Sequence, residues 1–506
     1  MLGGLPLLLL LATISTANAW GPTVTVDPSR REQVIEGFGG FGPARPWWVE
    51  GPFFDRSWLD KLDDLGVTIV RTQLYWDFER ADGTFALGPT SDNGKQIAYL
   101  RELRSRGIKI LATAWTPPVW MKRDTDDKLA AFCHGQCGGS LAAGHYRDFA
   151  QLLVEYVEQM RAAGVEIYAV SFANEPLFAN PFESCTYTER TYAKVLKIVG
   201  SAFARAGLTT RLYGPEHMAN ADWNERFFER LLDDPQAAQY LDFYAVHGYV
   251  DGKTGDPISA TEWTKLDERV HGAGKELWLT ETSDFDHQGW DKALLTAKSL
   301  YRGLRFGKVS AWLHWYLADD VMGPAPQNAP TSLYYALKQF YRYIRPGYAQ
   351  LVSTSDDADV LPLAFGCEND LTIILINDGV SSKSVALNLT GETLPSFRLY
   401  RTSRGENAAR VEAIVGGVVS LPPQSISTLV ATSGGSGSGD GGVTSTGVRL
   451  GLPVCASGPD GSHRARRPDP SPPAAHQSRL ILICAGALAA GLLLLWVLRL
   501  RLKAPS

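Results

Sequence analysis

Two glutamates at the ends of strand-like apolar runs are the residues of this sequence best placed to do chemistry. Glu175 closes the run 170–174, and Glu281 follows the run 277–280. A strand that is buried on both faces needs such a run, and an α/β barrel places its catalytic groups where the strands end. Paired carboxylates cleave glycosidic bonds, one as the proton donor and the other as the nucleophile or base. Either glutamate alone fits a solvated strand end equally well, but the pair predicts a glycoside-cleaving site.

The elements that must position this pair form a long alternating series. Apolar, strand-like runs lie at residues 34–39, 67–73, 108–114, 167–173, 211–214, 241–246, 276–280 and 309–315. Amphipathic, helix-like segments between them include 58–65, 94–106, 146–163, 188–206 and 292–306. Because strands that alternate with helices pair in parallel, the series predicts the α/β class and a (β/α)8 TIM barrel.

Further residues suited to sugar binding stand near the ends of these strands. They are Arg71, Trp115, Asn174, Glu216, His217, His247, Tyr249, Trp315 and Tyr316. Any one of them is more often structural, as a buried histidine usually is. Their shared position at strand ends nevertheless predicts that they line one site.

The composition limits the class of protein. At 506 residues the chain exceeds one small domain, and its 45% apolar and 20% charged residues are typical of a globular protein. The net charge of −5 creates no basic surface, so we expect no nucleic-acid partner. After the barrel, expected over 37–345, short β-like runs divided by Gly, Asp, Asn and Pro predict an appended β-sandwich over 346–432.

Both ends of the chain carry segments typical of membrane targeting. Residues 1–19 resemble a signal peptide, and residues 433–479 a disordered stalk rich in Gly, Ser and Pro. The apolar run 480–498 predicts a C-terminal transmembrane helix, and the basic residues of 499–506 a short cytoplasmic tail. A lipid anchor is the alternative, although its hydrophobic signal normally ends the chain. We therefore expect a secretory-pathway, single-pass membrane protein with an extracellular or lumenal catalytic domain, and a glycosylation sequon starts at Asn388.

The six cysteines of the chain fit an oxidising compartment. Cys133, Cys137 and Cys185 fall in neighbouring loops, and we expect one pair among them to form a disulfide, with the choice of pair left open. The spacing of Cys133 and Cys137 around His134 provides too few ligands for a metal site.

The glycines of residues 37–42 formally match the phosphate-binding pattern GxGxxG. A dinucleotide site requires a helix immediately afterwards, whereas Pro43, Pro46 and two tryptophans follow here. The glycines instead favour a tight turn beside a ligand pocket.

Five motifs, taken in order, resemble those of glycoside hydrolase family 30 in clan A. They are Glu36-Gly37-Phe38-Gly39-Gly40, Trp115-Thr116-Pro117-Pro118-Val119-Trp120-Met121-Lys122, Asn174-Glu175-Pro176, Leu277-Trp278-Leu279-Thr280-Glu281 and Arg345-Pro346-Gly347-Tyr348. The overall sequence most resembles the xylanase-like branch of that family. The resemblance spans about residues 23–432. It implies a retaining β-glycosidase with a barrel and a β-sandwich that also includes the N-terminal strand 20–36. No metal or organic cofactor is implied.

The same resemblance implies roles for individual residues. By motif match, Glu175 is the expected general acid/base and Glu281 the expected nucleophile. Asn174 is expected to bind the sugar 2-hydroxyl, and Trp115 and Trp315 to shape the sugar subsite.

Arg71, Tyr249 and His247 are also expected in this substrate site. A retaining enzyme requires its two carboxyl groups roughly 5–5.5 Å apart. The acid must stay protonated near the working pH, which a neighbouring negative nucleophile favours. Arg71 and aromatic hydroxyls such as that of Tyr249 are the candidates to keep the nucleophile ionised. His247, at the end of the sixth predicted strand, is a further expected substrate-binding residue.

The loop after the eighth strand bears on the expected substrate, an oligo- or polysaccharide. In the resembled family, the glucuronoxylan-cleaving branch has an arginine there whose guanidinium fork binds the uronate carboxylate. Here the loop 316–324 holds no arginine but the adjacent acids Asp319 and Asp320. If these acids face the substrate they repel a uronate, which favours a neutral xylan-like chain or a β-1,6-linked glucan or galactan. The alternative is that they only cap the loop and face solvent.

Two other functions fit the same features. One is a membrane-tethered carbohydrate-binding or adhesion ectodomain on an inactive barrel, and the other is a glucosylceramidase-like exo-glycosidase. The intact carboxylate pair argues against the first, because a pure binding protein does not need both acids.

Overall fold

The computed structural model describes residues 21–42, 56–124, 136–249, 258–323, 327–411, 414, 416–431, 452 and 455. The barrel and the β-sheet domain lie in one compact unit, which extends to Gly461. The predicted signal peptide and the predicted membrane span lie outside the described residues.

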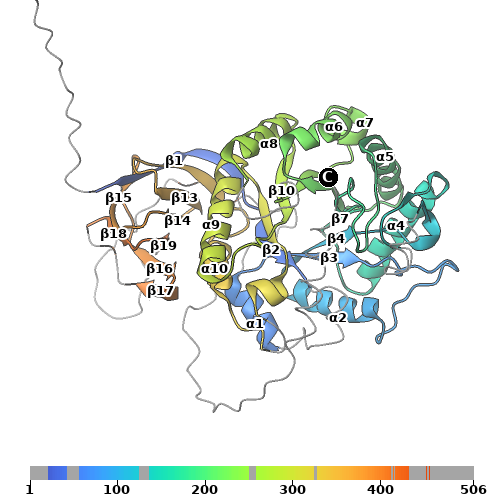
Figure 1. Cartoon of the computed structure of the whole chain (residues 1–506), viewed down its shortest axis with the longest axis horizontal. Coiled ribbons are helices and arrows are strands. Elements are labelled where there is room, and N and C mark those ends of the chain that lie inside the picture. The colour runs from blue at the N-terminus through green and yellow to red at the C-terminus, as the bar shows by residue number, and fades with distance from the viewer. Residues whose placement is uncertain are drawn as a thin grey trace, which may run out of the picture. The chain divides into compact units, whose positions relative to one another are not determined.

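Eight parallel strands close into a barrel (Figure 1). In chain order they are β2 (Gly37–Phe41), β3 (Ile69–Leu74), β4 (Lys109–Ala114), β7 (Ala169–Ser171), β8 (Arg211–Met218), β9 (Phe243–His247), β10 (Glu276–Glu281) and β11 (Ala311–His314). The ring closes where β11 pairs with β2. Each strand overlaps one of the eight predicted runs, so the TIM-barrel prediction is confirmed.

Helices surround this ring of strands (Figure 1). They are α1 (Arg56–Leu65), α2 (Asp92–Ser105), α4 (Tyr146–Ala162), α5 (Glu189–Arg205), α6 (Ala221–Leu231), α7 (Pro235–Ala238), α8 (Ala260–Gly272), α9 (Gly289–Phe306) and α10 (Ser332–Tyr341). Side chains cap several of their N-termini, as Ser91 caps α2 and Asn220 caps α6 by accepting backbone N–H bonds. The described residues of this part also form short 3-10 turns at Val119–Met121 and Ala143–His145 and a π-helical turn at Leu317–Val321. The short strands β5 (Lys122–Arg123) and β6 (Ser140–Leu141) pair antiparallel.

The interior of the barrel is a packed core rather than a pore. Its side chains are Ile69, Leu111, Ala169, Tyr213, Phe243, Ala245, Trp278, Ala311 and Leu313. The rings of Phe243 and Trp278 stack with centroids 3.9 Å apart. This filled interior gives the carboxyl ends of the strands a rigid floor, which is where a TIM barrel builds its active site.

The second domain is a nine-stranded sheet in the order β17-β16-β19-β14-β13-β12-β1-β15-β18. Its strands are β1 (Thr23–Val34), β12 (Ala349–Ser355), β13 (Val360–Cys367), β14 (Asp370–Asn377), β15 (Lys383–Leu389), β16 (Phe397–Ser403), β17 (Glu406–Val411), β18 (Val418–Leu421) and β19 (Ser425–Ala431). The predicted sandwich is thus one continuous curled sheet around a single core, since residues from both ends of the strand order share it. The N-terminal β1 lies between β12 and β15.

Successive side chains along a strand point to opposite faces, so this sheet contributes side chains to two hydrophobic cores. On β13, Ala364 packs inside the curled sheet, whereas Leu363 and Phe365 belong to the core that surrounds the barrel. Helix α10 contributes a polar contact to the same junction, because Gln339 donates a hydrogen bond of 2.7 Å to Thr402. The sheet therefore braces the outside of the barrel beside α9 and α10 (Figure 1).

The structure describes two of the three cysteines among which a disulfide was expected. Cys137 is disulfide-bonded and Cys185 is a buried free thiol, so Cys185 is not part of the predicted bridge. Cys133 lies outside the described residues. A further disulfide joins Cys367 of β13 to Cys455, which lies in the predicted stalk. The stalk prediction over 433–479 therefore differs from the structure at this point, because a covalent bond ties Cys455 to the sheet.

No helix among the described residues is both long and apolar enough to cross a membrane.

Candidate active site

The two predicted glutamates meet at the carboxyl end of the barrel. Glu281 is the last residue of β10, and Glu175 lies in the loop after β7 with a left-handed backbone φ of 49°. Both side chains are nearly buried, and one carboxylate oxygen of each lies within 4.8 Å of the other and of a His247 nitrogen. This spacing agrees with the roughly 5–5.5 Å that a retaining glycosidase requires and is too small for the water of an inverting one.

Arg71 on β3 is the buried hub of the site. Its Nη1 donates to Glu281 Oε2 at 2.6 Å, and its Nη2 donates to Asn174 Oδ1 at 2.7 Å. Its Nε lies 2.9 Å from Glu216 Oε1, and its guanidinium carbon lies 4.3 Å from the centre of the Trp115 ring. The planar guanidinium thus contacts all four of these side chains, which come from four different strand ends. A lysine lacks this fork of donors and could not contact them all.

Glu281 accepts a protein hydrogen bond on each oxygen. Arg71 bonds Oε2, and the Tyr249 hydroxyl donates to Oε1 at 3.1 Å. Burial raises the pKa of the Glu281 carboxyl, the positive charges of His247 and Arg71 oppose that rise, and Glu175 adds to it. Donors on both oxygens favour the ionised form of this carboxylate over a protonated one.

Glu175 has different neighbours. Asn180 Nδ2 donates to its Oε2 at 3.0 Å, and His247 Nδ1 lies 3.2 Å from its Oε1. Asn180 lies five residues after Glu175 in an irregular loop, so neither periodicity nor a strand end could have singled it out in the sequence.

His247 is a buried cation surrounded by three acids. Although burial opposes the charged imidazole, Glu281, Glu175 and Glu216 raise the pKa of His247 to about 9. Its Nε2 lies 3.6 Å from Glu216 Oε1, opposite the nitrogen that faces Glu175. The His247 imidazolium therefore links Glu175, in the loop after β7, to Glu216 on β8.

Glu216 on β8 is a completely buried member of the site. Burial tends to raise the pKa of Glu216, but Arg71 and His247 outweigh it and lower the value to about 2. Thr113 also donates to its Oε2 at 3.0 Å. The sequence predicts that Glu216 lies near a strand end but assigns it no role. The fold shows that it is the counter-ion of Arg71 and His247.

The charges of these five groups determine the protonation of the pair. Arg71 and His247 are positive and Glu216 is negative, so one proton on the Glu175–Glu281 pair makes the cluster neutral. In a buried cluster neutrality is strongly favoured, because an uncompensated charge is costly there. Glu175, His247 and Glu281 are also close enough to ligate a metal ion, but the two resident cations repel one.

Aromatic rings form one wall of the site. Trp315 stacks on Phe41 with centroids 4.3 Å apart, and Trp115 lies 5.3 Å from Phe41 and 6.3 Å from Trp315. Tyr316 stacks on Trp315 at 4.4 Å. The structure thus brings Trp115 and Trp315 together, and Phe41 of the glycine-rich stretch contacts both.

The two acids of the loop after β11 lie in different environments. Asp319 is exposed, whereas Asp320 bonds to Lys292 of α9, accepts from Ser283 at 3.0 Å and lies 2.8 Å from His314 Nε2. The expectation that both acids face either the substrate or the solvent is therefore wrong for Asp320, because Lys292 neutralises it inside the protein.

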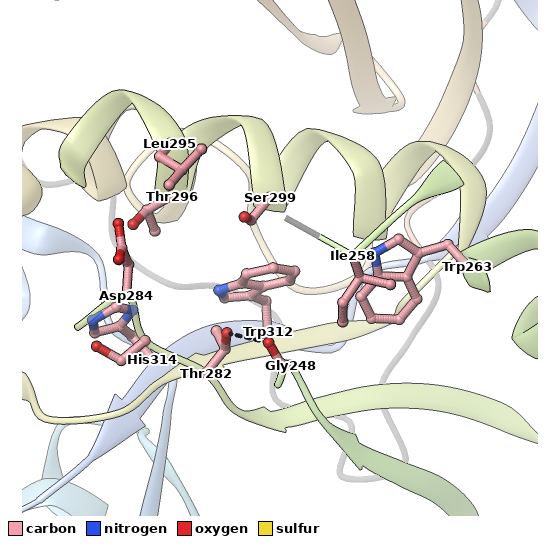
Figure 2. Close-up of a pocket in the computed structure, with 11 residues that line it drawn as sticks. Gly248, Ile258, Trp263, Thr282, Asp284, Leu295, Thr296, Ser299, Trp312 and His314 are labelled. Carbon is pink, nitrogen blue, oxygen red and sulfur yellow. Dashed lines mark hydrogen bonds between the residues drawn. The ribbon is translucent and has the colours of Figure 1, made fainter. Parts of the chain in front are cut away.

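A small cavity is lined by His314 and Ser283, two of the partners of Asp320, and Figure 2 shows most of its lining residues. It has about 20 Å³ of space for water-sized molecules, and α9 covers it with Thr296 and Ser299. Trp312 Nε1 and His314 Nδ1 are buried beside it without a hydrogen-bond partner among the described residues. A polar space of this size suits one water molecule rather than a sugar, so this cavity is not the catalytic centre.

Comparisons with known proteins agree with this geometry. The family described as the glycosyl hydrolase family 30 TIM-barrel domain matches residues 81–352. Glucuronoxylanase XynC of Bacillus subtilis strain 168 is 26% identical over 80% of this chain and 91% of its own. Lysosomal acid glucosylceramidase of Mus musculus is 23% identical over 74% of this chain and 79% of its own.

Solved structures show the same fold. A family 30 endoxylanase from Clostridium papyrosolvens C71 aligns with a TM-score of 0.67 and 23% identity, covering 81% of this chain and 99% of that one. The endo-β1,6-glucanase BT3312 aligns with a TM-score of 0.64 and 21% identity, covering 81% of this chain and 93% of that one. The family match covers more than half of the chain, and the carboxylate spacing fits the family's chemistry. The chain therefore belongs to glycosyl hydrolase family 30 and is a retaining β-glycoside hydrolase.

Proposed function

We propose that Glu281 is the nucleophile and Glu175 the general acid/base of a two-step displacement at a β-linked glycan. The observation that carries the assignment is the position of Arg71. Its permanently charged guanidinium bonds Glu281 at 2.6 Å, whereas Glu175 faces the neutral amide of Asn180 at 3.0 Å and His247 at 3.2 Å. The shared proton of the cluster therefore belongs on Glu175.

In the first step Glu281 attacks the anomeric carbon of the bound sugar. Glu175 donates its proton to the glycosidic oxygen, the bond between that oxygen and the anomeric carbon breaks, and a glycosyl ester forms on Glu281. The Asn174 side chain is held by Arg71 beside Glu175, where its amide NH₂ is available to the sugar 2-hydroxyl.

In the second step Glu175 is a carboxylate and takes a proton from water, which attacks the anomeric carbon and releases Glu281. His247 and Asn180 stabilise this carboxylate form, because both face its oxygens. Trp115 and Trp315 form the wall against which the sugar ring stacks.

The proposed substrate is a neutral β-linked polysaccharide, xylan-like or a β-1,6-linked glucan. Relatives named as glucuronoxylanase and endo-1,6-β-D-glucanase support a xylan or β-1,6-glucan backbone, and the proposal that the chain is neutral rests on the loop after β11. No arginine lies in the described part of the loop after β11, and Asp319 is exposed there, so a uronate carboxylate gains no partner from it.

Covalent trapping tests the assignment of the nucleophile. A 2-deoxy-2-fluoro-β-glycoside with a good leaving group should accumulate as an ester on Glu281, and peptide mass spectrometry should locate it. The matched control is Glu281→Gln, which should take up no label. Attachment to Glu216 or Glu276 instead would reject the assignment.

The location of the enzyme is a further part of this proposal. The signal-like segment 1–19 directs the chain into the secretory pathway, and the segment 480–498 anchors it in a membrane with the barrel outside the cytoplasm. Asn388, which is exposed on β15, is the proposed glycosylation site. Expression with and without the C-terminal segment, followed by fractionation and glycosidase treatment, tests these points.

A further inference from the structure

Exposed apolar side chains gather around the catalytic pair. Among the described residues, the large apolar side chains that remain exposed include Leu177, Trp223 and Phe285, with exposed fractions of 38%, 38% and 41%. All three follow barrel strands at their carboxyl ends, and Leu177 stands two residues after Glu175. Apolar surface left open at the mouth of a site marks a place where a ligand binds.

Trp223 is the best supported of these residues. It lies in the first turn of α6, and its ring stacks on that of His217 with centroids 6.0 Å apart and planes 23° apart. Phe178 lies 5.5 Å from His217 and 6.3 Å from Trp223, which completes an aromatic cluster of three rings. The cluster fixes the orientation of an indole that is still more than one-third exposed.

His217 is unusual within this cluster. It is 1% exposed, and neither of its ring nitrogens has a hydrogen-bond partner among the described residues. Burial lowers its pKa to about 4, against the opposing effect of Glu175. A neutral ring stacks beneath Trp223 without adding a third positive charge beside the catalytic acid.

The cluster adjoins the proposed acid Glu175. The Phe178 backbone N–H donates to the Glu175 carbonyl at 3.0 Å, and His217 directly follows Glu216, whose carbonyl accepts from the Glu175 N–H at 3.1 Å. In a retaining mechanism the acid touches the departing oxygen, so the surface next to it faces the leaving group.

We propose that Trp223, supported by His217 and Phe178, forms a subsite for a sugar residue on the leaving-group side of the cleaved bond. The enzyme then cleaves bonds within a chain of sugars. This inference rests on the proposed role of Glu175 as the acid. A flat indole face suits the apolar face of a sugar ring, and the exposed Asp222 beside it can accept bonds from hydroxyls.

The same subsite also binds an acceptor sugar in the second step. The acceptor hydroxyl attacks the anomeric carbon of the glycosyl ester, Glu175 takes the hydroxyl proton, and the ester bond breaks to release Glu281 as a carboxylate. The product is a longer oligosaccharide instead of a hydrolysed one.

The test compares substrates with and without a leaving sugar. The probes are β-xylobiosyl fluoride and xylohexaose, with gentiobiosyl fluoride and gentiohexaose in parallel. Fluoride needs no leaving-side subsite, so Trp223→Ala should hydrolyse the fluoride within about twofold of the wild-type rate while kcat/KM on the hexasaccharide falls about tenfold. In Trp223→Ala, the yield of elongated oligosaccharides formed by transfer to an acceptor sugar should fall together with this kcat/KM.

Matched variants make the result specific. Trp223→Phe keeps an aromatic face and should recover most of the loss on the hexasaccharide, whereas Val380→Ala, an 88% exposed residue of the sheet domain, should change nothing. Equal losses on fluoride and hexasaccharide, or no loss on either, would overturn the subsite. A loss confined to long-chain alkyl glycosides would also overturn it, because the surface then takes an apolar aglycone. If the wild-type enzyme cleaves none of the fluorides and neither hexasaccharide, the proposed xylan-like or β-1,6-glucan substrate fails, rather than the subsite.

Discussion

Arg71 and Glu281 form a buried ion pair, with the guanidinium Nη1 2.6 Å from the carboxylate Oε2. The same guanidinium pairs with Glu216, which no solvent reaches. A buried charge without its partner is strongly destabilising, so Arg71 holds the ionised nucleophile and the fold of the site together.

We expect Arg71→Met to damage both stability and activity. The change removes the nearer of the two cations that face Glu216 and Glu281, which costs about 3–5 kcal/mol of unfolding free energy for a broken buried pair. Urea unfolding and kcat/KM on an activated aryl glycoside measure the two effects. Arg71→Lys is the matched control, because it keeps the charge but loses the fork, and it should recover stability more than activity. Wild-type activity in Arg71→Met would contradict this role.

Removal of the proposed acid should depend on the leaving group. Glu175→Ala is expected to slow substrates with sugar leaving groups by about 10²–10⁴-fold and activated aryl glycosides much less, because the latter need little protonation. Added azide should restore turnover of the aryl glycoside by replacing the activated water. Asn180→Ala keeps the acid and serves as the control without azide rescue. A similar loss on both kinds of substrate would count against Glu175.

The charge on His247 predicts a loss of stability at alkaline pH. Burial opposes this charge, but Glu281, Glu175 and Glu216 raise its pKa to about 9 from the usual 6.5. A proton held more tightly in the folded state stabilises the protein fully below the unfolded pKa, and the effect disappears as the pH rises through the folded value. The free energy of unfolding should therefore fall between about pH 6.5 and 9, by an amount on the order of 1–3 kcal/mol.

Urea unfolding of His247→Gln over the same pH range is the comparison that isolates this effect. Glutamine carries no titrating group, so the variant should be less stable near pH 6 and should lack most of the alkaline slope. Parallel slopes in the two proteins would show that another group titrates.

The two acids of the loop after β11 should differ in their effect on substrate choice. Asp319→Asn removes an exposed charge and should raise the rate on glucuronoxylan by about two- to threefold relative to the carboxyl-reduced polymer. Asp320→Asn removes the partner of Lys292, His314 and Ser283, so it should lower activity on both polymers alike. The ratio of the two rates is the measurement, and a strong wild-type preference for the uronate-bearing polymer would reject the proposed neutral substrate.

Truncation should separate the sheet domain from the predicted anchor. A chain that ends at residue 461 keeps Cys455 paired with Cys367, and we expect it to be secreted with unchanged kcat/KM. A chain that ends at residue 432 loses this disulfide and should be less stable by about 2–4 kcal/mol. Equal stability of the two under oxidising conditions would show that the bridge contributes little.

The local pattern of the sequence determined the barrel and the position of its two acids. An apolar run of strand length is needed wherever a strand is buried on both faces, so each of the eight strands left a readable signal. Because the carboxyl ends of parallel strands converge, the positions of Glu175 and Glu281 after two such runs are enough to predict that they meet.

Only the tertiary structure decided which groups surround those acids. The Glu216 bond to Arg71 and the Lys292 bond to Asp320 join segments whose sequences carry no shared pattern. A carboxylate in solvent and one paired inside the protein look alike in a sequence, since burial and partner are properties of contacts between distant segments. The same holds for the disulfide of Cys367 with Cys455, because any two of several cysteines can pair until the fold brings two of them together.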